Sequence, residues 1–209
     1  MAREEGLAEQ FASDSATIKT IYNEWSPTYD ADTDSWGYEA PGVAAEMLAS
    51  RTEVEGQILD VGCGSGKVGK ALAALGYHDV VGVDVSPALL DIAATTGAYH
   101  ALAEADFTTL PTDLLEASFA GLICVGVMTY LPDVEAVCRE FARLVEPGGT
   151  IVVSQRTDLF ASRDTQAAFD ALAADGTWSI VEITNERPYL PGHDEYQGID
   201  VRYGVFDRR

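Results

Sequence analysis

The sequence contains few of the residues that build disulfide frameworks and metal centres. Three of its 209 residues are cysteines and three are histidines. The odd cysteine count argues against a disulfide framework, and no C-x-x-C or H-x-x-x-H spacing suggests zinc. Cys63 and Cys124 stand in apolar, strand-like stretches. We therefore predict that the cysteines are small buried hydrophobic residues and that the protein has no metal site.

Basic residues are also scarce, since 13 lysines and arginines stand against 34 acidic residues and give a formal net charge of -21. Such a surface repels nucleic-acid backbones and anionic lipids. No apolar run approaches the roughly 20 residues that cross a bilayer. The N-terminus "MAREEGLAEQFASDS" lacks the apolar region of a signal peptide. We expect a cytoplasmic monomer or homodimer that binds neither nucleic acid nor membranes.

Apolar runs rich in β-branched residues alternate with helical patterns along most of the chain. The strand-like runs are 56–62, 79–85, 120–127 and 149–155, and the helical patterns are 66–76, 87–97 and 133–149. This alternation predicts a Rossmann-like, doubly wound α/β fold with helices on both faces of a mostly parallel sheet. The later runs "WSIVEITNERPYL" and "GIDVRYGVFDRR" have no helix between them, so they should pair antiparallel.

The stretch "ILDVGCGSGKVGK", residues 58–70, follows an apolar run with a cluster of glycines and partly fits two nucleotide-binding motifs. A P-loop needs one more residue before its Gly-Lys pair, and Ser or Thr in place of Val68. Gly64, Gly66 and Gly69 have the spacing of a dinucleotide motif. Asp84, 20 residues after Gly64, stands where such a motif binds a ribose diol.

Asp60 favours a different ligand for the same loop. A carboxylate at the end of the strand, ahead of Gly62, would repel a pyrophosphate and attract a cation. S-adenosylmethionine carries an ammonium group, a sulfonium group and a ribose diol, but no phosphate. Gly62, Gly64 and Gly66 would let the backbone approach this ligand closely. The Asp84 carboxylate would accept hydrogen bonds from both ribose hydroxyls.

The pair "ILDVGCGSGKVGKALAALG" and "VVGVDVSPALLDIA" resembles class I S-adenosylmethionine-dependent methyltransferases, from about residue 20 to the C-terminus. The resemblance implies a seven-stranded sheet that ends in an antiparallel hairpin. It also implies methyl transfer from S-adenosylmethionine, with S-adenosylhomocysteine as product. The predicted parts outside the sheet are short, so we expect a small-molecule acceptor, with a protein tail as the alternative. It adds Cys63 and Val85 to the expected cofactor site. Asp106 and the Phe107 backbone would bind adenine, and the Val125 carbonyl would meet the ammonium group.

The N-terminal stretch "YNEWSPTYDADTDSWGYEAP" resembles the small methyltransferase-like proteins of the Williams–Beuren region. By that similarity Tyr22, Trp25 and Tyr29 form a lid over the cofactor, with Trp36 on the substrate side. Aromatic faces attract a sulfonium group, and a closed lid excludes water. The alternative is that these aromatic residues only pack the N-terminal helix against the sheet.

The length suits a single domain of 209 residues. We divide it into an N-terminal helical cap or lid (1–50), a cofactor-binding core (51–155), and a substrate-side helix with the C-terminal hairpin (156–209). The cap should cover the open end of the sheet, where doubly wound sheets bind their ligands.

Two histidines follow the fourth strand in some related sequences, but this chain has Thr129 and Tyr130 there. Tyr130 and His193 are our candidate catalytic residues. Tyr130 is also a candidate for substrate binding, with Arg156 for a carboxylate and Asp158 for a proton or an amine. Displacement at a sulfonium depends mainly on alignment, although an amine or phenol acceptor must still lose a proton, directly or to water. An O, N or C acceptor therefore stays open.

Two alternatives stay open beside the methyltransferase hypothesis. The chain could be a non-catalytic, S-adenosylmethionine-binding regulatory protein of the same fold, or a nicotinamide-dependent oxidoreductase. Within the glycine motif, we expect Gly69 to pack the first core helix against the sheet. Lys67 should be a solvated residue on that helix.

Overall fold

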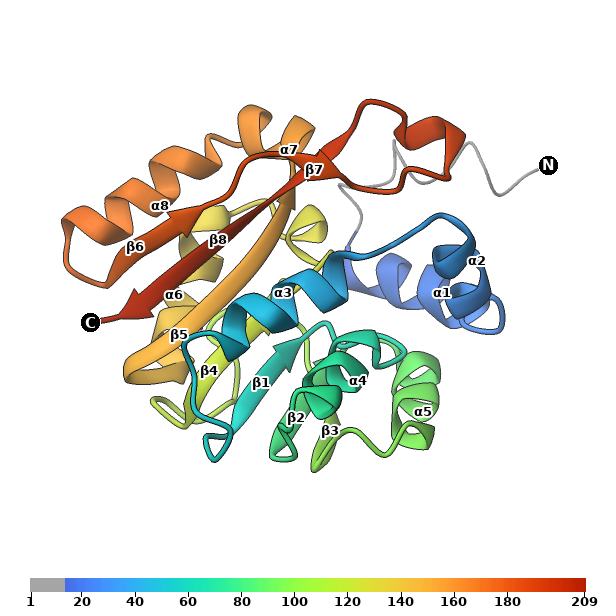
Figure 1. Ribbon diagram of the computed structural model, residues 1–209, viewed down its shortest axis with the longest axis horizontal. Helices are drawn as coiled ribbons and strands as arrows, with labels where there is room; N and C mark the ends of the chain where they lie inside the picture. Colours follow the sequence, from blue (N-terminus) through green and yellow to red (C-terminus); the bar gives the residue numbers. More distant parts are fainter. Residues whose placement is uncertain (1–13) are drawn as a thin grey trace.

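A mixed β-sheet forms the centre of the protein (Figure 1). The computed structural model describes residues 14–209, so residues 1–13 of the expected cap lie outside the described residues. Within the described part the strand order is β3-β2-β1-β4-β5-β8-β6, with β7 paired to β8. The pairs from β3 to β5 are parallel, whereas β8 is antiparallel to its neighbours β5, β6 and β7. This arrangement confirms the doubly wound sheet with an antiparallel C-terminal part.

All strands but β3, whose residues are largely exposed, overlap the apolar runs of the sequence. The strands are β1 (Ile58–Val61), β2 (Val80–Asp84), β3 (Ala101–Glu104), β4 (Phe119–Cys124), β5 (Val145–Arg156), β6 (Trp178–Ile183), β7 (Arg187–Pro188) and β8 (Asp200–Arg208). β8 inserts between β5 and β6, so the two C-terminal runs pair antiparallel as predicted.

Eight α-helices and two short 3-10 helices complete the described part. They are α1 (Ser15–Trp25), α2 (Tyr29–Ser35), α3 (Ala40–Ala49), α4 (Lys67–Ala74), α5 (Pro87–Thr95), η1 (Met128–Tyr130), α6 (Val134–Leu144), α7 (Thr157–Ser162), α8 (Thr165–Ala174) and η2 (Asp194–Tyr196). The Ser86 side chain caps α5 by accepting from Leu89 N at 3.2 Å, with Pro87 at the first helical position. The predicted helix 133–149 ends earlier, because Val145 is already extended and begins β5.

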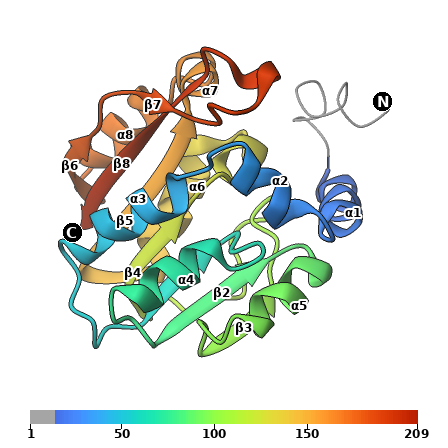
Figure 2. The ribbon, with the colours of Figure 1, turned by 45° about the vertical axis from the view of Figure 1, so that its right-hand side comes forward.

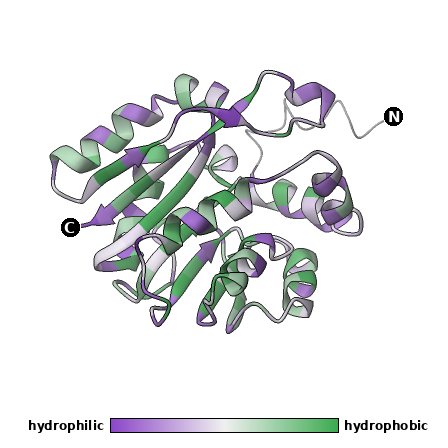
Figure 3. Cartoon of the chain, viewed as in Figure 1, coloured by the Kyte–Doolittle hydropathy of each residue, from purple (hydrophilic) through white to green (hydrophobic). Residues whose placement is uncertain are grey.

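Two apolar clusters lie on opposite faces of the sheet. One joins α6 and α8 to the sheet through residues such as Phe141 and Phe169, and the other joins α3 and α4 to it through Leu48 and Leu72. Along the central strands the colouring of Figure 3 is mainly hydrophobic. In Figures 1 and 2, α1 and α2 lie together at one end of the protein, and α1 contacts α5. α1 and α2 therefore stand at the open end of the sheet, whereas α3, which belongs to the same expected cap, packs on a face of the sheet beside α4.

Gly69 of α4 is a helix–sheet packing position, as the sequence suggested. A Cβ atom at Gly69 would lie 2.3 Å from Tyr99 Cζ, and the Gly69 N–H donates to the Tyr99 hydroxyl at 3.1 Å. In α3, by contrast, a Cβ atom at Gly42 would meet nothing within 4 Å.

These two helical glycines give a matched test of packing. We expect Gly69→Ala to lower the free energy of unfolding by about 1–3 kcal/mol, because the Tyr99 ring must move. Gly42→Ala should raise it by about 0.5–1 kcal/mol, because alanine loses less backbone entropy in a helix. Urea unfolding followed by circular dichroism measures both. Equal effects of the two substitutions would contradict the packing role of Gly69.

Candidate functional site

A cavity lies at the carboxyl ends of β1, β2 and β4. At this point the strand order reverses, because the chain runs from β1 to β2 and β3 on one side and then returns to β4 on the other side of β1. The walls of the cavity come from α1 and α2, the glycine loop, the ends of β2, β4 and β5, and the segment 189–196. Doubly wound sheets bind ligands at such a switch point.

The glycine loop forms the floor of this cavity at the end of β1. Gly62 and Gly64 line the cavity and have φ angles of 68° and 53°, in the left-handed region that favours glycine. A Cβ atom at Gly62 would lie 2.0 Å from Val127 Cγ2, so no larger residue fits. Gly66 and Cys63 do not line the cavity. Gly66 precedes α4 and packs toward Thr96, and Cys63 is buried.

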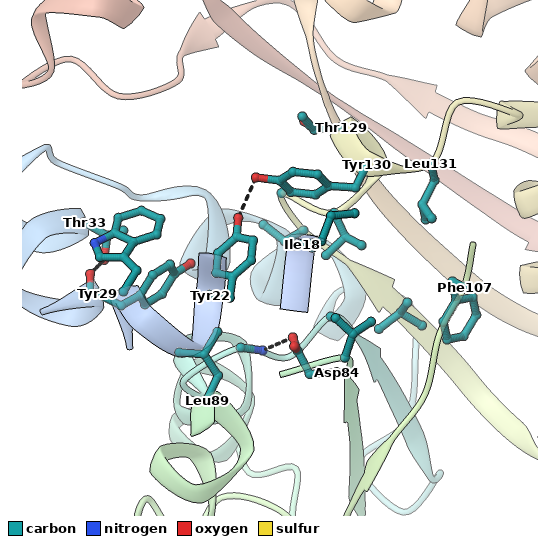
Figure 4. A pocket seen from close by; sticks show the side chains of 18 of the residues that line it. Ile18, Tyr22, Tyr29, Thr33, Asp84, Leu89, Phe107, Thr129, Tyr130 and Leu131 are labelled. Carbon is teal, nitrogen blue, oxygen red and sulfur yellow. Dashed lines mark hydrogen bonds between the residues drawn. The ribbon is translucent and has the colours of Figure 1, made fainter. Parts of the chain in front are cut away.

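Asp84 ends β2 and is locked against the loop by two backbone hydrogen bonds. Its Oδ2 accepts from Gly64 N at 2.9 Å, and its Oδ1 accepts from Ser86 N at 2.8 Å (Figure 4 draws the first). Burial raises the pKa of Asp84, although these hydrogen bonds act in the opposite direction. A carboxylate has about four lone-pair sites. Asp84 therefore keeps acceptor capacity on both oxygens, which fits a diol.

Asp60, which we expected to help bind the cofactor, is fully buried and does not line the cavity. Side chains alternate along a strand, and Asp60 lies on the same face of β1 as Ile58, toward α4. Its Oδ2 accepts from the Tyr99 hydroxyl at 2.7 Å, while its fully buried Oδ1 has no hydrogen-bond partner within residues 14–209. Burial raises the pKa of Asp60 to about 7. Asp60 can act on a ligand only through Tyr99 and the loop.

The other expected cofactor contacts on the core line the cavity. Val85 follows Asp84, Val125 follows β4, and Asp106 and Phe107 form the far wall. Asp106 Oδ1 accepts from the backbone N and the hydroxyl of Thr108, at 2.8 and 2.7 Å. The Ser15 side chain is a further hydrogen-bond partner of Asp106. A carboxylate has about four lone-pair sites, so Asp106 can still accept from a ligand amino group.

Aromatic residues from the cap cover the opposite side of the cavity. Tyr22, Trp25, Tyr29 and Trp36 all line it. The Tyr22 and Tyr130 hydroxyls are 2.7 Å apart and point toward each other in Figure 4. Burial is the main cause that raises the pKa of Tyr130 to about 12. The structure therefore brings the predicted lid residues and Tyr130 together.

These rings continue into an aromatic collar that links the cap to the C-terminal loop. Its members are Tyr130, Tyr22, Trp25, Trp36, His193, Tyr196, Tyr189 and Tyr38, with neighbouring ring centroids 4.5–5.9 Å apart. Sequence reasoning missed Tyr38, Tyr189 and Tyr196, which line the cavity. It chose His193 from the same loop, but His193 does not line the cavity. Its Nδ1 accepts from Glu195 N at 3.2 Å.

Arg156 lies at the end of β5, where it lines the cavity and is buried. Its Nε and Nη2 donate to the Asp158 carboxylate at 3.1 and 2.6 Å. The guanidinium carbon stands 4.9 Å from the centre of the Tyr196 ring. Asp158 is more exposed and does not line the cavity, so it holds Arg156 in place rather than facing a ligand.

Lys67 is not simply solvated, because it joins α4 to the cap. It pairs with Asp34, and its Nζ lies 3.7 Å from Asp30 Oδ1. Asp30 also accepts from the Ser65 hydroxyl and lies 3.9 Å from Lys70 Nζ. These contacts fasten α2 to the glycine loop and the start of α4.

Lys19 makes a similar connection between α1 and the core. Its ammonium group pairs with Glu104 at the end of β3. All three lysines of the chain, Lys19, Lys67 and Lys70, therefore contact carboxylates between the cap and the core.

Among residues 14–209 there is no group of three or more His, Cys, Asp or Glu side chains placed to hold a metal ion. No helix in that range is both long and apolar enough to cross a membrane.

Comparisons with known proteins point to one family. The family profile for the "Methyltransferase domain" matches residues 59–153. Human methyltransferase-like protein 27 is 31% identical in an alignment of 166 residues that covers 76% of this chain and 66% of that protein. The ubiquinone biosynthesis O-methyltransferase of Xanthomonas oryzae pv. oryzae is 30% identical, over 78% of this chain and 66% of that protein. The chain thus spans just under two thirds of these relatives.

A solved structure supports the same fold. A TehB-like S-adenosylmethionine-dependent methyltransferase from Corynebacterium glutamicum has a TM-score of 0.62 and 21% identity. The match covers 94% of this chain and all of that one, at 100%.

The buried Asp60 predicts a pH dependence of stability. Its pKa rises from 3.8 to about 7 on folding. Ionisation of the buried carboxyl therefore does not lower the free energy of unfolding below a pH of about 3.8, and lowers it fully above a pH of about 7. Between pH 5 and pH 8 the free energy of unfolding should fall by roughly 2–3 kcal/mol through this group alone. Asp60→Asn removes that contribution.

Urea unfolding at a series of pH values measures the effect of Asp60. The difference in stability between Asp60→Asn and the unsubstituted protein should grow as the pH rises. Asp91→Asn, at an exposed position of α5, should keep the original pH dependence. Parallel pH curves for Asp60→Asn and the unsubstituted protein would show that Asp60 stays ionised in the fold.

The ion pairs of Lys67 predict local control of the cap. Lys67→Gln should increase hydrogen exchange of the α2 amides about 2- to 5-fold, because a surface pair contributes about 0.2–1 kcal/mol. Lys70→Gln should have a smaller effect, since its Nζ is farther from Asp30 and its side chain is 50% exposed. Exchange measured by mass spectrometry tests both. An unchanged α2 in Lys67→Gln contradicts the role of this pair.

Proposed function

We propose that this chain, which belongs to the class I S-adenosylmethionine-dependent methyltransferases, transfers a methyl group to a small-molecule acceptor. S-adenosylmethionine is the cofactor of the family. The main support is the Asp84 carboxylate, which Gly64 N and Ser86 N hold at the end of β2 inside the cavity. A hydrogen-bond acceptor held in place in this way suits a ribose diol, and the ligand needs no phosphate group beside that diol.

We assign the parts of the cofactor to the residues around it as follows. Asp84 and Val85 hold the ribose, and Asp106 and Phe107 hold the adenine. Gly62, Gly64 and the Val125 carbonyl receive the amino-acid end. Asp60, Cys63 and Gly66 contribute only by shaping the loop. Tyr22, Trp25 and Tyr29 cover the sulfonium, where aromatic faces stabilise a cation by about 0.5–2 kcal/mol.

When bound, S-adenosylmethionine supplies a methyl group already activated by the sulfonium. The protein has to hold the acceptor in line with that methyl group and exclude water, and such alignment can supply much of the rate. The cap and the aromatic collar perform both tasks, because they close the cavity from α1 to the segment 189–196. We place Tyr130, Trp36 and Arg156 on the acceptor side, with Asp158 positioning Arg156.

The acceptor and the compartment are part of the same proposal. A net charge of -21 disfavours nucleic-acid acceptors, and most residues that line the cavity are apolar or aromatic, as in small-molecule sites. The three cysteines are free and buried, which suits a reducing compartment such as the cytoplasm. A monomer or a homodimer agrees with this function.

Thermal melting with added ligands tests the cofactor. S-adenosylhomocysteine should raise the melting temperature, since a ligand that binds only the folded state stabilises it. NADH should not, and a shift with NADH alone would favour the oxidoreductase alternative. Transfer of labelled methyl groups to a metabolite extract, followed by mass spectrometry, then separates a catalyst from a regulatory cofactor-binding protein.

Asp84 should dominate the binding of the cofactor. Asp84→Ala should weaken binding of S-adenosylhomocysteine by roughly 1–3 kcal/mol, because hydrogen bonds to a charged acceptor are lost. Asp91→Ala removes an exposed carboxylate outside the cavity and should leave the affinity unchanged. Isothermal titration calorimetry measures both affinities. Equal affinities for the two variants would remove Asp84 from the cofactor site.

A further inference from the structure

We infer that Asn23 is a positioning residue for the cofactor: its side chain fastens α1 to Ser86, and the strength of this attachment sets the rate at which the cofactor enters and leaves the cavity. This role rests on the proposed function, because it concerns the proposed cofactor site. Three features of α1 carry it: the two rows of side chains along the helix, the hydrogen bonds around Ser86, and the small number of buried residues in the helix.

The side chains of α1 form two rows, because residues three or four apart lie on the same side of a helix. The members of the first row line the cavity, and they are Ile18, Tyr22 and Trp25. The members of the second row are spaced four residues apart and contact the core, and they are Ser15, Lys19 and Asn23. Covering the cavity and attaching α1 to the core are thus tasks of different rows.

The second row is attached where β2 and β3 end, beside the residues that we propose for the ribose and the adenine. Lys19 pairs with Glu104, the last residue of β3. Ser15 is a hydrogen-bond partner of Asp106, two residues later. The third attachment is that of Asn23, just after the end of β2. α1 therefore forms the wall of the cavity that stands over the proposed cofactor contacts.

Ser86 connects Asn23 to the proposed ribose site. It is completely buried, and its hydroxyl donates to Asn23 Oδ1 at 2.7 Å while accepting from Leu89 N at 3.2 Å. Its backbone N–H donates to Asp84 Oδ1 at 2.8 Å. The Ala88 N–H also donates to Asn23 Oδ1, at 3.3 Å. A hydroxyl has one proton to donate, so loss of the Asn23 acceptor leaves a buried donor unpaired and destabilises the closed position of α1.

Few apolar side chains oppose the movement of α1. Within this helix, all of whose residues the structure describes, only Ile18 is buried, whereas α6 has the same length of 11 residues and buries seven. Elements with little apolar burial open most readily. α2 is fastened separately, through Asp30 and Asp34. The polar row of α1 is therefore the main restraint on its opening, which can occur while α2 stays in place.

Opening of α1 is a step in every turnover, since the product S-adenosylhomocysteine has to leave before the next cofactor enters. Lid opening of this kind sets the rate of many enzymes. A change that destabilises the closed position raises the open fraction of the complex, and the release rate rises by the same factor. Asn23 does not line the cavity, so it acts on release through Ser86 and not by touching the ligand.

The release rate of S-adenosylhomocysteine tests this role. Trp25 and Trp36 line the cavity, so release after dilution of the complex can be followed by stopped-flow tryptophan fluorescence. Asn23→Ala should raise the release rate at least about 5-fold, because a buried donor loses its partner. Asn23→Asp keeps an acceptor oxygen, at a helix N-terminus that favours negative charge, and should stay within about 2-fold of the original rate. Glu24→Ala, at the exposed neighbouring position of α1, should not change the rate.

Substitution from the core side provides an independent measurement. Ser86→Ala removes the same hydrogen bond, so it should also raise the release rate. In the double variant no donor is left unpaired, and the combined effect should be smaller than the product of the two separate effects. Thermal melts show that each variant is folded, and Ser86→Ala alone still decides the matter if Asn23→Ala does not fold.

Three outcomes overturn the inference. These are a release rate that Asn23→Ala and Ser86→Ala leave unchanged, equal effects of Asn23→Ala and Glu24→Ala, and effects of the two substitutions that multiply in the double variant. A residue with a merely structural role would lower the melting temperature without changing the release rate, and Asp would not restore its function. If S-adenosylhomocysteine does not bind the unsubstituted protein, the proposed function fails instead.

Discussion

The hydrogen bond from the Gly64 amide to the Asp84 carboxylate determines the geometry of the candidate site, and the other elements are arranged around it. It joins the end of β2 to the glycine loop that follows β1, so the two adjacent strands present one acceptor at the switch point of the sheet. The contact requires the loop to turn through left-handed conformations, which explains the glycines at 62 and 64. It also keeps a buried carboxylate supplied with donors, without which the carboxylate would destabilise the fold.

The cap and the C-terminal loop are far apart in the sequence, but they close the same cavity. Tyr22 and Trp36 come from the cap, whereas Tyr189 and Tyr196 follow β7. Their meeting depends on β8, whose insertion between β5 and β6 directs the preceding loop over the carboxyl end of β5. Arg156, the last residue of β5, is covered by that loop. The side of the site that we propose for the acceptor thus depends on the antiparallel part of the sheet.

The proposed cofactor side of the site was more predictable from sequence than the proposed acceptor side. The glycine loop and Asp84 depend on local spacing, and the alternation of strands and helices places both at the same edge of the sheet. The orientation of Asp60 depends on its place in the pleat and on Tyr99, which is 39 residues away in the sequence. Lys67 has its partner Asp34 at a separation of 33 residues. No local pattern encodes such contacts, and for the same reason Tyr189 and Tyr196 were missed.

The placement of the lysines has a practical consequence for chemistry on this protein. The chain has three lysines, and each one contacts a carboxylate where the described cap meets the core. Amine-directed reagents, whether fluorophores, cross-linkers or solid supports, would therefore react with side chains at that junction and leave the sheet and the C-terminal loop untouched. A label attached at Lys67 or Lys70 reports directly on movement of α2. Random immobilisation through lysine, in contrast, would clamp the cap.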